Sequence, residues 1–476
     1  MTNHAADSPR VHAFGDDALG DLDAVGVAEA ISAGTISARE AAEAAYARAE
    51  RVDPHLNAVV LLDTERALAT ADAPRPGRLS GVPTFVKDNT DVAGLPTREG
   101  SLAVPDVPRT ADAEFTTQLR STGMVFLGKS TMPEFGWSAS TEFATLPPTR
   151  NPWNPEFSSG ASSGGSAALV AAGVVPIAHA NDGGGSIRIP AAACGLVGLK
   201  PTRGRVALAA ESHDMPVDVI SNGVVTRTVR DTAHFLRAAE EHRPAPGLPP
   251  VGLVEGPSDR RLRIGLVLDS ITDTPTDPET RSAVLDVARD LEKLGHEVVE
   301  VDVPADQAFV EAFTHYWAML AFSMHRFGKR LVHPDFDPRL TDPLTQYLSR
   351  RFVRQAWRTP RAIWTLKRSK ALYRETFAAQ GIDLGLSPTL AHTTPRLGYL
   401  SPNEPFPDMF DRLVRYAAFT PVNNATGSPA ISLPLGRTST DLPIGVHLMA
   451  RHGDERTLLE VAYELEAERP FARIQD

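Results

Sequence analysis

The pattern of apolar and polar positions predicts alternating strands and helices. The clearest helical repeat lies between Asp277 and Gly295, where apolar residues recur at three- and four-residue spacing. Asp277 and Pro278 predict the start of this helix, and Gly295 predicts its end. Apolar, β-branched runs at residues 262–268 and 298–301 flank it. The order strand, helix, strand predicts a layered α/β fold.

Two further segments carry boundary signals. Ser37 and Glu40 form a capping-box pattern that predicts a helix from there to about Val52. Residues 243–250, RPAPGLPP, are incompatible with a helix or a central strand. They form either a surface loop or a linker between domains, and we favour the loop.

Composition indicates a folded protein and narrows its partners. Of the 476 residues, 42% are hydrophobic and 22% are charged, which is typical of a folded protein with a large core. The formal net charge of -11 opposes binding to a nucleic-acid backbone and favours a small, neutral or apolar substrate. We therefore expect no nucleic-acid partner.

The N-terminal residues and the single cysteine indicate where in the cell the protein is expected. The first residues lack a basic end followed by an apolar stretch, and no apolar run approaches the ~18 residues of a membrane span. Residues 1–20 are expected to form a loosely ordered leader. Cys194 is the only cysteine, which excludes an internal disulfide and a zinc site built on several thiolates. We expect a cytoplasmic protein that does not enter membranes.

Two clusters of glycine and serine between residues 158 and 202 are the strongest candidates for chemistry. In the second cluster, Gly183, Gly184 and Gly185 precede Ser186, so successive backbone N–H groups of these four residues can point into one small volume as an oxyanion hole. The alternative is a glycine-rich surface turn. Asp182 and Arg188 flank the cluster closely enough to pair across it, and such a clamp favours a fixed loop.

The first cluster and an upstream lysine supply candidate partners for Ser186. Ser162 is either the N-cap of the helix that follows or a catalytic hydroxyl. A serine nucleophile needs a base. His179 lies in an apolar run and is expected to be a core histidine. Lys87 ends an apolar strand, where burial can lower a lysine pKa and supply a neutral amine, although a lysine there can also extend its charge to solvent.

These segments together resemble the amidase signature family. Ser162 and Ser186 stand 24 residues apart, as the two serines of the family pattern do, and Cys194 to Thr202 read CGLVGLKPT. The resemblance continues in residues 81–89 (GVPTFVKDN) and 128–135 (GKSTMPEF), and in two segments nearer the C-terminus, residues 419–423 (FTPVN) and 427–434 (GSPAISLP). It covers nearly the whole chain.

The resemblance implies a fold and a mechanism. It implies one α/β domain over residues 1–476, with a large mixed central sheet flanked by helices. It also implies that the protein is an amide hydrolase with Ser186 as nucleophile, Ser162 as a bridging serine next to a cis peptide, and Lys87 as base and acid. No metal or cofactor is implied.

The resemblance also suggests the type of substrate. Residues 180–183 read ANDG where the family usually has a threonine before the aspartate, and residue 161 is alanine in place of the usual serine. The first variant is similar to that of amidases acting on aryl amides or short oligoamides, with esters and carbamates as further options. Met132, Trp137 and Asn181 are candidate substrate-binding residues. We expect a small-molecule amide as the substrate and a homodimer as one option for assembly.

Three rival interpretations fit the sequence less well. Residues 123–130 (GMVFLGKS) match the P-loop expression, but the four middle residues have the pattern of a strand. Residues 160–164 (GASSG) match the nucleophile elbow of a Ser-His esterase using Ser162, but residues 151–155 were not expected to form the strand that an elbow requires. The amidotransferase subunit that supplies ammonia to misacylated tRNA typically has glutamine where this chain has Ile189.

Overall fold

The computed structural model describes residues 10–272, 274–302 and 305–476, and its main feature is an eight-stranded mixed sheet. Its strands are β6 (Ile177–Asp182), β7 (Val197–Lys200), β8 (Ser221–Thr226), β9 (Arg263–Leu266), β10 (Glu297–Glu300), β11 (Leu384–Pro388), β12 (Ala430–Arg437) and β13 (Pro443–Ala450). Their spatial order is β10-β9-β11-β13-β12-β7-β8-β6. The three strands β10, β9 and β11 run parallel, and every other neighbouring pair is antiparallel.

A smaller sheet adjoins the edge strand β6. It contains β1 (Val59–Leu62), β2 (Pro83–Lys87) and β3 (Val125–Ser130), in the order β1-β3-β2. Strand β2 lies beside β6, but no backbone ladder joins the two strands. They are connected by hydrogen bonds between a side chain and the backbone: the Thr84 hydroxyl donates to the carbonyl of Ile177, and the N–H of Lys87 donates to His179 Nδ1. This junction brings the end of β2 beside the end of β6.

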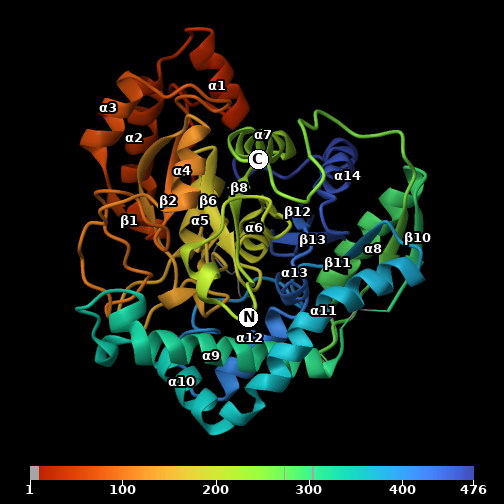
Figure 1. Cartoon of the computed structure of the whole chain (residues 1–476). Helices are drawn as coiled ribbons and strands as arrows, with labels where there is room; N and C mark the ends of the chain where they lie inside the picture. The colour runs from red at the N-terminus through yellow and green to blue at the C-terminus, as the bar shows by residue number, and fades with distance from the viewer. Residues whose placement is uncertain (1–9, 273, 303–304) are drawn as a thin grey trace, which may run out of the picture.

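Helices cover both sheets, and Figure 1 shows α9 to α12 gathered below the central sheet in that view. The N-terminal half contains α1 (Ala24–Ser32), α2 (Ala38–Leu56), α3 (Thr64–Asp72), α4 (Glu114–Ser121), α5 (Gly164–Ala171), α6 (Arg188–Cys194) and α7 (Val229–His242). The C-terminal half contains α8 (Pro278–Lys293), α9 (Gln307–Leu331), α10 (Pro343–Gln355), α11 (Thr359–Ala379), α12 (Asp408–Tyr416), α13 (Pro421–Thr426) and α14 (Glu455–Glu468). Short 3-10 turns are η1 (Glu134–Gly136), η2 (Ala210–Asp214), η3 (Pro338–Leu340) and η4 (Ala356–Arg358).

The elements predicted from periodicity are present. The predicted strand, helix and strand are β9, α8 and β10, with the Asp277 carboxylate capping α8 and Gly295 in a left-handed conformation after it. The capping box of Ser37 and Glu40 is formed, and α2 continues to Leu56, beyond the predicted end. Local signals therefore defined helix starts well.

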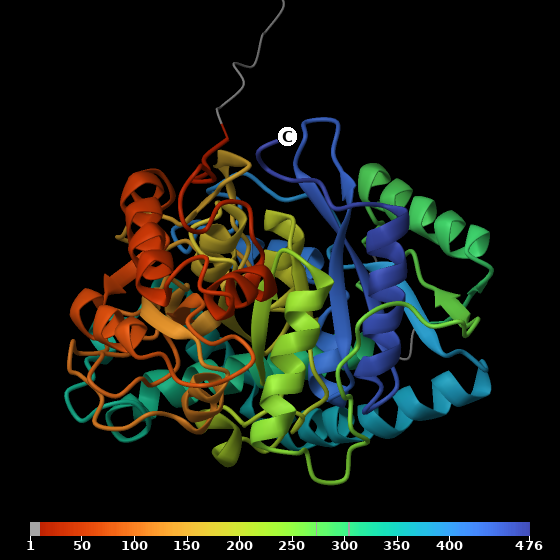
Figure 2. The ribbon, with the colours of Figure 1, turned by 90° about the horizontal axis from the view of Figure 1, so that it is seen from above.

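The proline-rich segment 243–250 is a loop and does not divide the protein. Strands β6, β7 and β8 precede it, strands β9 to β13 follow it, and all eight belong to one sheet. Figure 2 shows the strands of the two halves side by side in this sheet, with those of the N-terminal half towards the left and those of the C-terminal half towards the right. The predicted large mixed sheet flanked by helices is confirmed.

The expected leader is only partly within the described residues. Residues 1–9 lie outside them. In residues 10–20, however, the N–H of Val11 donates to the carbonyl of Pro152, and Ala13 is fully buried. For residues 10–20 the prediction of a loosely ordered leader is therefore wrong, because these residues pack on the body of the protein.

The segment before the first glycine cluster also differs from expectation. Residues 154–158 form a strand, β5 (Asn154–Ser158), which pairs with β4 (Arg150–Asn151) in a two-stranded hairpin. Pro155 is accommodated because this small sheet consists of edge strands alone. The argument that no strand precedes residue 160 is thus wrong, and the esterase alternative has to be judged from the partners of Ser162.

Candidate active site

Lys87 is placed at the end of β2 and is fully buried. Its Nζ lies 2.7 Å from Ser162 Oγ and 2.6 Å from Asn181 Oδ1. Asn181 belongs to β6, the strand beside β2. Two neighbouring strands and one turn therefore fix the amine next to the Ser162 hydroxyl.

Ser162 lies in the turn that precedes α5, after a cis peptide bond with Ala161. The N-cap residue of α5 is Ser163, and it makes no side-chain capping bond. Ser162 is therefore not the helix cap, and its hydroxyl is held by Lys87. Gly136 lies against it: a Cβ atom at position 136 would come within 2.9 Å of Ser162 Oγ.

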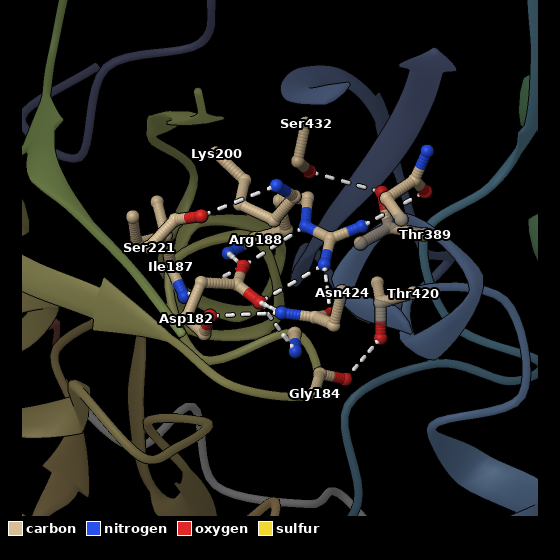
Figure 3. Close-up of polar contacts among 12 residues, drawn as sticks. Asp182, Gly184, Ile187, Arg188, Lys200, Ser221, Thr389, Thr420, Asn424 and Ser432 are labelled. Atoms are coloured by element: carbon tan, nitrogen blue, oxygen red, sulfur yellow. Dashed lines mark hydrogen bonds and ion pairs between the residues drawn. The ribbon is translucent and has the colours of Figure 1, made fainter. Parts of the chain in front are cut away.

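The loop carrying Ser186 is organised by the predicted clamp between Asp182 and Arg188 (Figure 3). Arg188 Nε donates to Asp182 Oδ2 and Nη2 donates to Oδ1, each at 2.9 Å, and both side chains are fully buried. The same carboxylate accepts the N–H groups of Gly185 at 2.7 Å and Ile187 at 3.2 Å. Burial raises the pKa of Asp182, but the charge of Arg188 and its hydrogen bonds outweigh this effect, so the pKa lies well below its usual range.

Helix α13 supports the loop from the other side. The Asn424 amide donates to both the backbone carbonyl and the carboxylate of Asp182, each at 2.8 Å, and its Oδ1 accepts from Arg188 at 2.7 Å. The Thr420 hydroxyl donates to the carbonyl of Gly184 at 2.6 Å (Figure 3). These two residues were not predicted individually. Thr420 lies in the FTPVN segment that supports the resemblance and Asn424 directly follows it, so sequence position was the only available signal.

The backbone N–H groups of the loop divide into two sets. The N–H of Gly185 is used by Asp182, so the predicted contribution of Gly185 to an oxyanion hole is not available in this structure. Within the described ranges, the N–H groups of Gly183, Gly184 and Ser186 have no protein acceptor. These three remain candidates to bind an oxyanion.

Ser186 and Gly184 line a cavity that opens to solvent. Of the three predicted substrate-binding residues, Trp137 lines this cavity and Met132 and Asn181 do not. Met132 is buried near Gly136, behind the cavity wall, and Asn181 instead contacts Lys87. These two side chains therefore lie outside the lining of this cavity, and their role in substrate binding stays a prediction.

The alternative bases and motifs lie elsewhere. His179 is fully buried in β6 and packs on Phe115 at a ring distance of 4.8 Å. Burial lowers its pKa to about 3, which confirms a core histidine. In the P-loop-like segment, β3 includes Lys129, whose buried amine donates to the carbonyl of Thr90 at 2.9 Å. That lysine is committed to the protein interior and is not placed to bind phosphate.

The described residues provide no candidate metal site and no candidate membrane span. They hold no group of three or more His, Cys, Asp or Glu side chains placed to bind a metal ion. Among residues 10–272, 274–302 and 305–476, no helix combines the length and the apolar character that a membrane span requires.

Comparison with known proteins identifies the class. The family model named Amidase matches residues 40–459. A protein of Mycobacterium tuberculosis that bears the name amidase AmiC is 50% identical over 468 residues, covering 98% of each chain. The structure of 6-aminohexanoate cyclic dimer hydrolase superposes with a TM-score of 0.86 at 31% identity, covering 97% of this chain and 99% of the other.

A second solved structure points the same way. It is a bacterial aryl acylamidase of the amidase signature family, with a TM-score of 0.82 at 27% identity, covering 95% of this chain and 97% of that chain. The chain therefore belongs to the amidase family, whose members use the amidase signature, and it is a hydrolase that acts on amides. Members of this family work through an acylated serine.

The clamp generates a first prediction. Asp182→Asn leaves the buried guanidinium of Arg188 without its counter-charge, so we expect a loss of about 3–5 kcal/mol in the free energy of unfolding. Loosening the loop should also lower kcat by ~100-fold. Denaturant titration and steady-state kinetics measure the two effects.

Asp231→Asn is the matched control for Asp182→Asn. Asp231 is also fully buried, but it accepts the backbone N–H groups of Ala24 and Val25, far along the chain from the loop. We expect this variant to retain its kcat. Equal losses of kcat in both variants would contradict a specific role of the clamp in the loop.

Lys200, at the end of β7, generates a prediction about stability and pH. Burial, followed by the charge of Arg188, lowers its pKa from 10.5 to about 7. Between these values the unfolded chain binds a proton that the folded chain does not, so this residue makes the free energy of unfolding rise with pH from about 7 to 10.5. Thermal unfolding of Lys200→Met should show a smaller rise across this window than the unchanged protein. Parallel profiles would show that Lys200 keeps an ordinary pKa.

Proposed function

We propose that Ser186 is the nucleophile of this amidase, that Ser162 transfers its proton, and that Lys87 is the base. The observation that carries the proposal is the buried contact of 2.7 Å between Lys87 Nζ and Ser162 Oγ, beside the loop that presents Ser186 to the cavity. Burial disfavours an ammonium ion and favours the neutral amine that a base requires. Ser162 is then the hydroxyl that links the amine to the nucleophile.

In the acylation half of the reaction, Ser186 Oγ attacks the amide carbonyl carbon. Ser162 Oγ takes the proton of Ser186 while Lys87 takes the proton of Ser162. The net result is the transfer of one proton from Ser186 to Lys87. The N–H groups of Gly183, Gly184 and Ser186 are the proposed donors to the resulting oxyanion. The proton then returns through Ser162 to the amide nitrogen, the C–N bond breaks, and the amine leaves.

In the second half, water replaces the amine and the relay runs again. Lys87, through Ser162, accepts a proton from the water that attacks the acyl carbon. The tetrahedral intermediate collapses, the Ser186 ester bond breaks, and Ser186 recovers its proton. The products are a carboxylic acid and the free enzyme, and each half-reaction leaves the lysine as it began.

The two alternative functions find less support. The esterase alternative needs a histidine at Ser162, and that hydroxyl contacts Lys87 instead. For the amidotransferase alternative, the position that typically carries glutamine is Ile189, which lines the cavity and makes its wall apolar. An ammonia-supplying subunit binds a polar amide side chain, for which an apolar wall is a poor match.

The proposal extends to the substrates, the assembly and the location of the protein. Aryl amides and short oligoamides are the proposed substrates, because the two structural relatives are a cyclic-dimer hydrolase of 6-aminohexanoate and an aryl acylamidase. Reactions with esters and carbamates, the homodimer, the cytoplasmic location and the absence of any metal or cofactor requirement stay predictions.

The relay is tested by substitution. With an aryl amide substrate, Ser186→Ala should lower kcat at least ~10⁴-fold, because no acyl-enzyme forms. Ser162→Ala and Lys87→Met should each lower it by ~10²–10⁴-fold, the range of general acid–base catalysis. Steady-state release of the arylamine measures all three.

Ser163→Ala is the matched control for Ser162→Ala. Ser163 is the next residue in the same turn, and its hydroxyl contacts the carbonyl of Asn181 at 3.3 Å. This variant should keep near-normal activity, and a chelator should have no effect on the unchanged protein. Full activity in Lys87→Met would overturn the mechanism.

The pH profile separates a lysine base from a histidine base. Lys87 accepts a proton only as a neutral amine, so kcat/KM should rise from neutral to alkaline pH. A rate governed by His179, with a pKa of about 3, would already be constant across that range. A maximum below about pH 6 would contradict the lysine base.

A further inference from the structure

Three aromatic side chains form a continuous ladder along one face of α9. Phe309, Phe313 and Trp317 recur at four-residue intervals, which places them above one another on a helix. The rings of Phe309 and Phe313 are 6.0 Å apart with an angle of 25° between their planes, and those of Phe313 and Trp317 are 5.8 Å apart at 20°. We call these three residues the aromatic ladder.

The ladder begins at the nucleophile loop. A Cβ atom at Gly184 would lie 3.7 Å from the Phe313 ring and 3.8 Å from the Trp317 ring, so this loop packs directly on two of its members. Phe309 extends the stack by one more helical turn. All three residues line the cavity that also contains Ser186.

The rest of the cavity lining is mostly apolar as well. It includes Phe410, Leu413 and Val414 of α12, a helix that follows α9 by about a hundred residues in the chain. Among the described residues that line this cavity there is no Asp, Glu, Lys, Arg or His. An apolar group suits this lining, whereas a charged group would lose its hydration without gaining a counter-charge.

We propose that the amide substrate carries an uncharged, elongated apolar group, alkyl or aryl, that lies along the aromatic ladder from Ser186 towards Phe309. The proposal rests on Ser186 being the nucleophile, as argued above. The apolar group can belong either to the acyl part or to the amine part of the substrate, because both flank the bond that is cleaved. The experiment below distinguishes these two sources.

The first arm varies the acyl chain. Nitroanilides of acetic, butyric, hexanoic and octanoic acids share one leaving group, and kcat/KM should rise about threefold or more per added methylene where the chain meets the ladder. The nitroanilide of adipic acid has the chain length of the hexanoic compound but ends in a carboxylate, and the 6-aminohexanoic compound ends in an ammonium. Both charged substrates should have kcat/KM values at least about tenfold below the hexanoic value.

The second arm varies the amine. A series of acetamides with alkylamine leaving groups of increasing length is measured by release of acetate. A rise of kcat/KM with length in one arm only assigns the ladder to that part of the substrate. A flat response in both arms, or equal rates for the hexanoic and adipic compounds, would overturn the proposal.

A pair of variants connects the chain-length effect to the ladder. Phe309→Ala removes the outer ring, so the advantage of the longest substrate over the shortest in the responsive arm should fall about tenfold. The rate on the shortest substrate is the reference within each variant, so a general loss of activity cancels from this ratio. Phe327→Ala is the matched control, because Phe327 is on the same helix but is 48% exposed, outside the cavity. An equal loss of chain-length preference in both variants would also count against the proposal.

The outcomes separate this proposal from the proposed function. Activity that survives Ser186→Ala would show that the nucleophile is misassigned. Activity that requires Ser186 but ignores chain length and terminal charge would leave the nucleophile in place and reject only the ladder as a binding surface.

Discussion

The arrangement of the active site depends on one buried ion pair, Asp182 with Arg188. Its carboxylate binds the guanidinium and also accepts two N–H groups of the loop between the two residues. A buried ion pair is weak evidence for high stability, because desolvation of both charges opposes their attraction. Here its role is to fix the shape of the loop, because each of the two carboxylate oxygens of Asp182 accepts a backbone N–H group of the loop. Asn424 joins the pair to α13 and so couples the loop to the C-terminal part of the chain.

The second constraint is the junction between the two sheets. Strands β2 and β6 are neighbours without a backbone ladder between them, and they are joined by Thr84 and by the N–H of Lys87. As a result the lysine from one sheet reaches Asn181 on the other and the turn that carries Ser162. The chemistry is thus assembled at the ends of strands, while helices distant in the chain form the cavity. The proposed catalytic residues Lys87 and Ser162 and the proposed substrate-binding surface thus belong to different parts of the molecule.

Several features followed directly from local sequence. The helix α8, the capping box of α2 and the pairing of Asp182 with Arg188 involve residues close together in the chain, so their spacing was enough. Where prediction failed, the arrangement of the folded loop and of the two sheets had decided the outcome. Gly185 was expected to face the oxyanion, but its N–H is taken by Asp182, and Asn181 was expected in the pocket but contacts Lys87.

By itself, the sequence determined the family motifs, the glycine-rich loop with its flanking charges, and the identity of the three candidate catalytic residues. It could not show that Ser162 touches Lys87, because 75 residues separate them and only the packing of β2 beside β6 closes that distance. Nor could it show that Phe309, Phe313 and Trp317 face Ser186, since an aromatic repeat on a helix looks the same whether it packs in a core or lines a cavity. Tertiary structure decided both, because burial and cavity walls are set by elements that meet only in the folded chain.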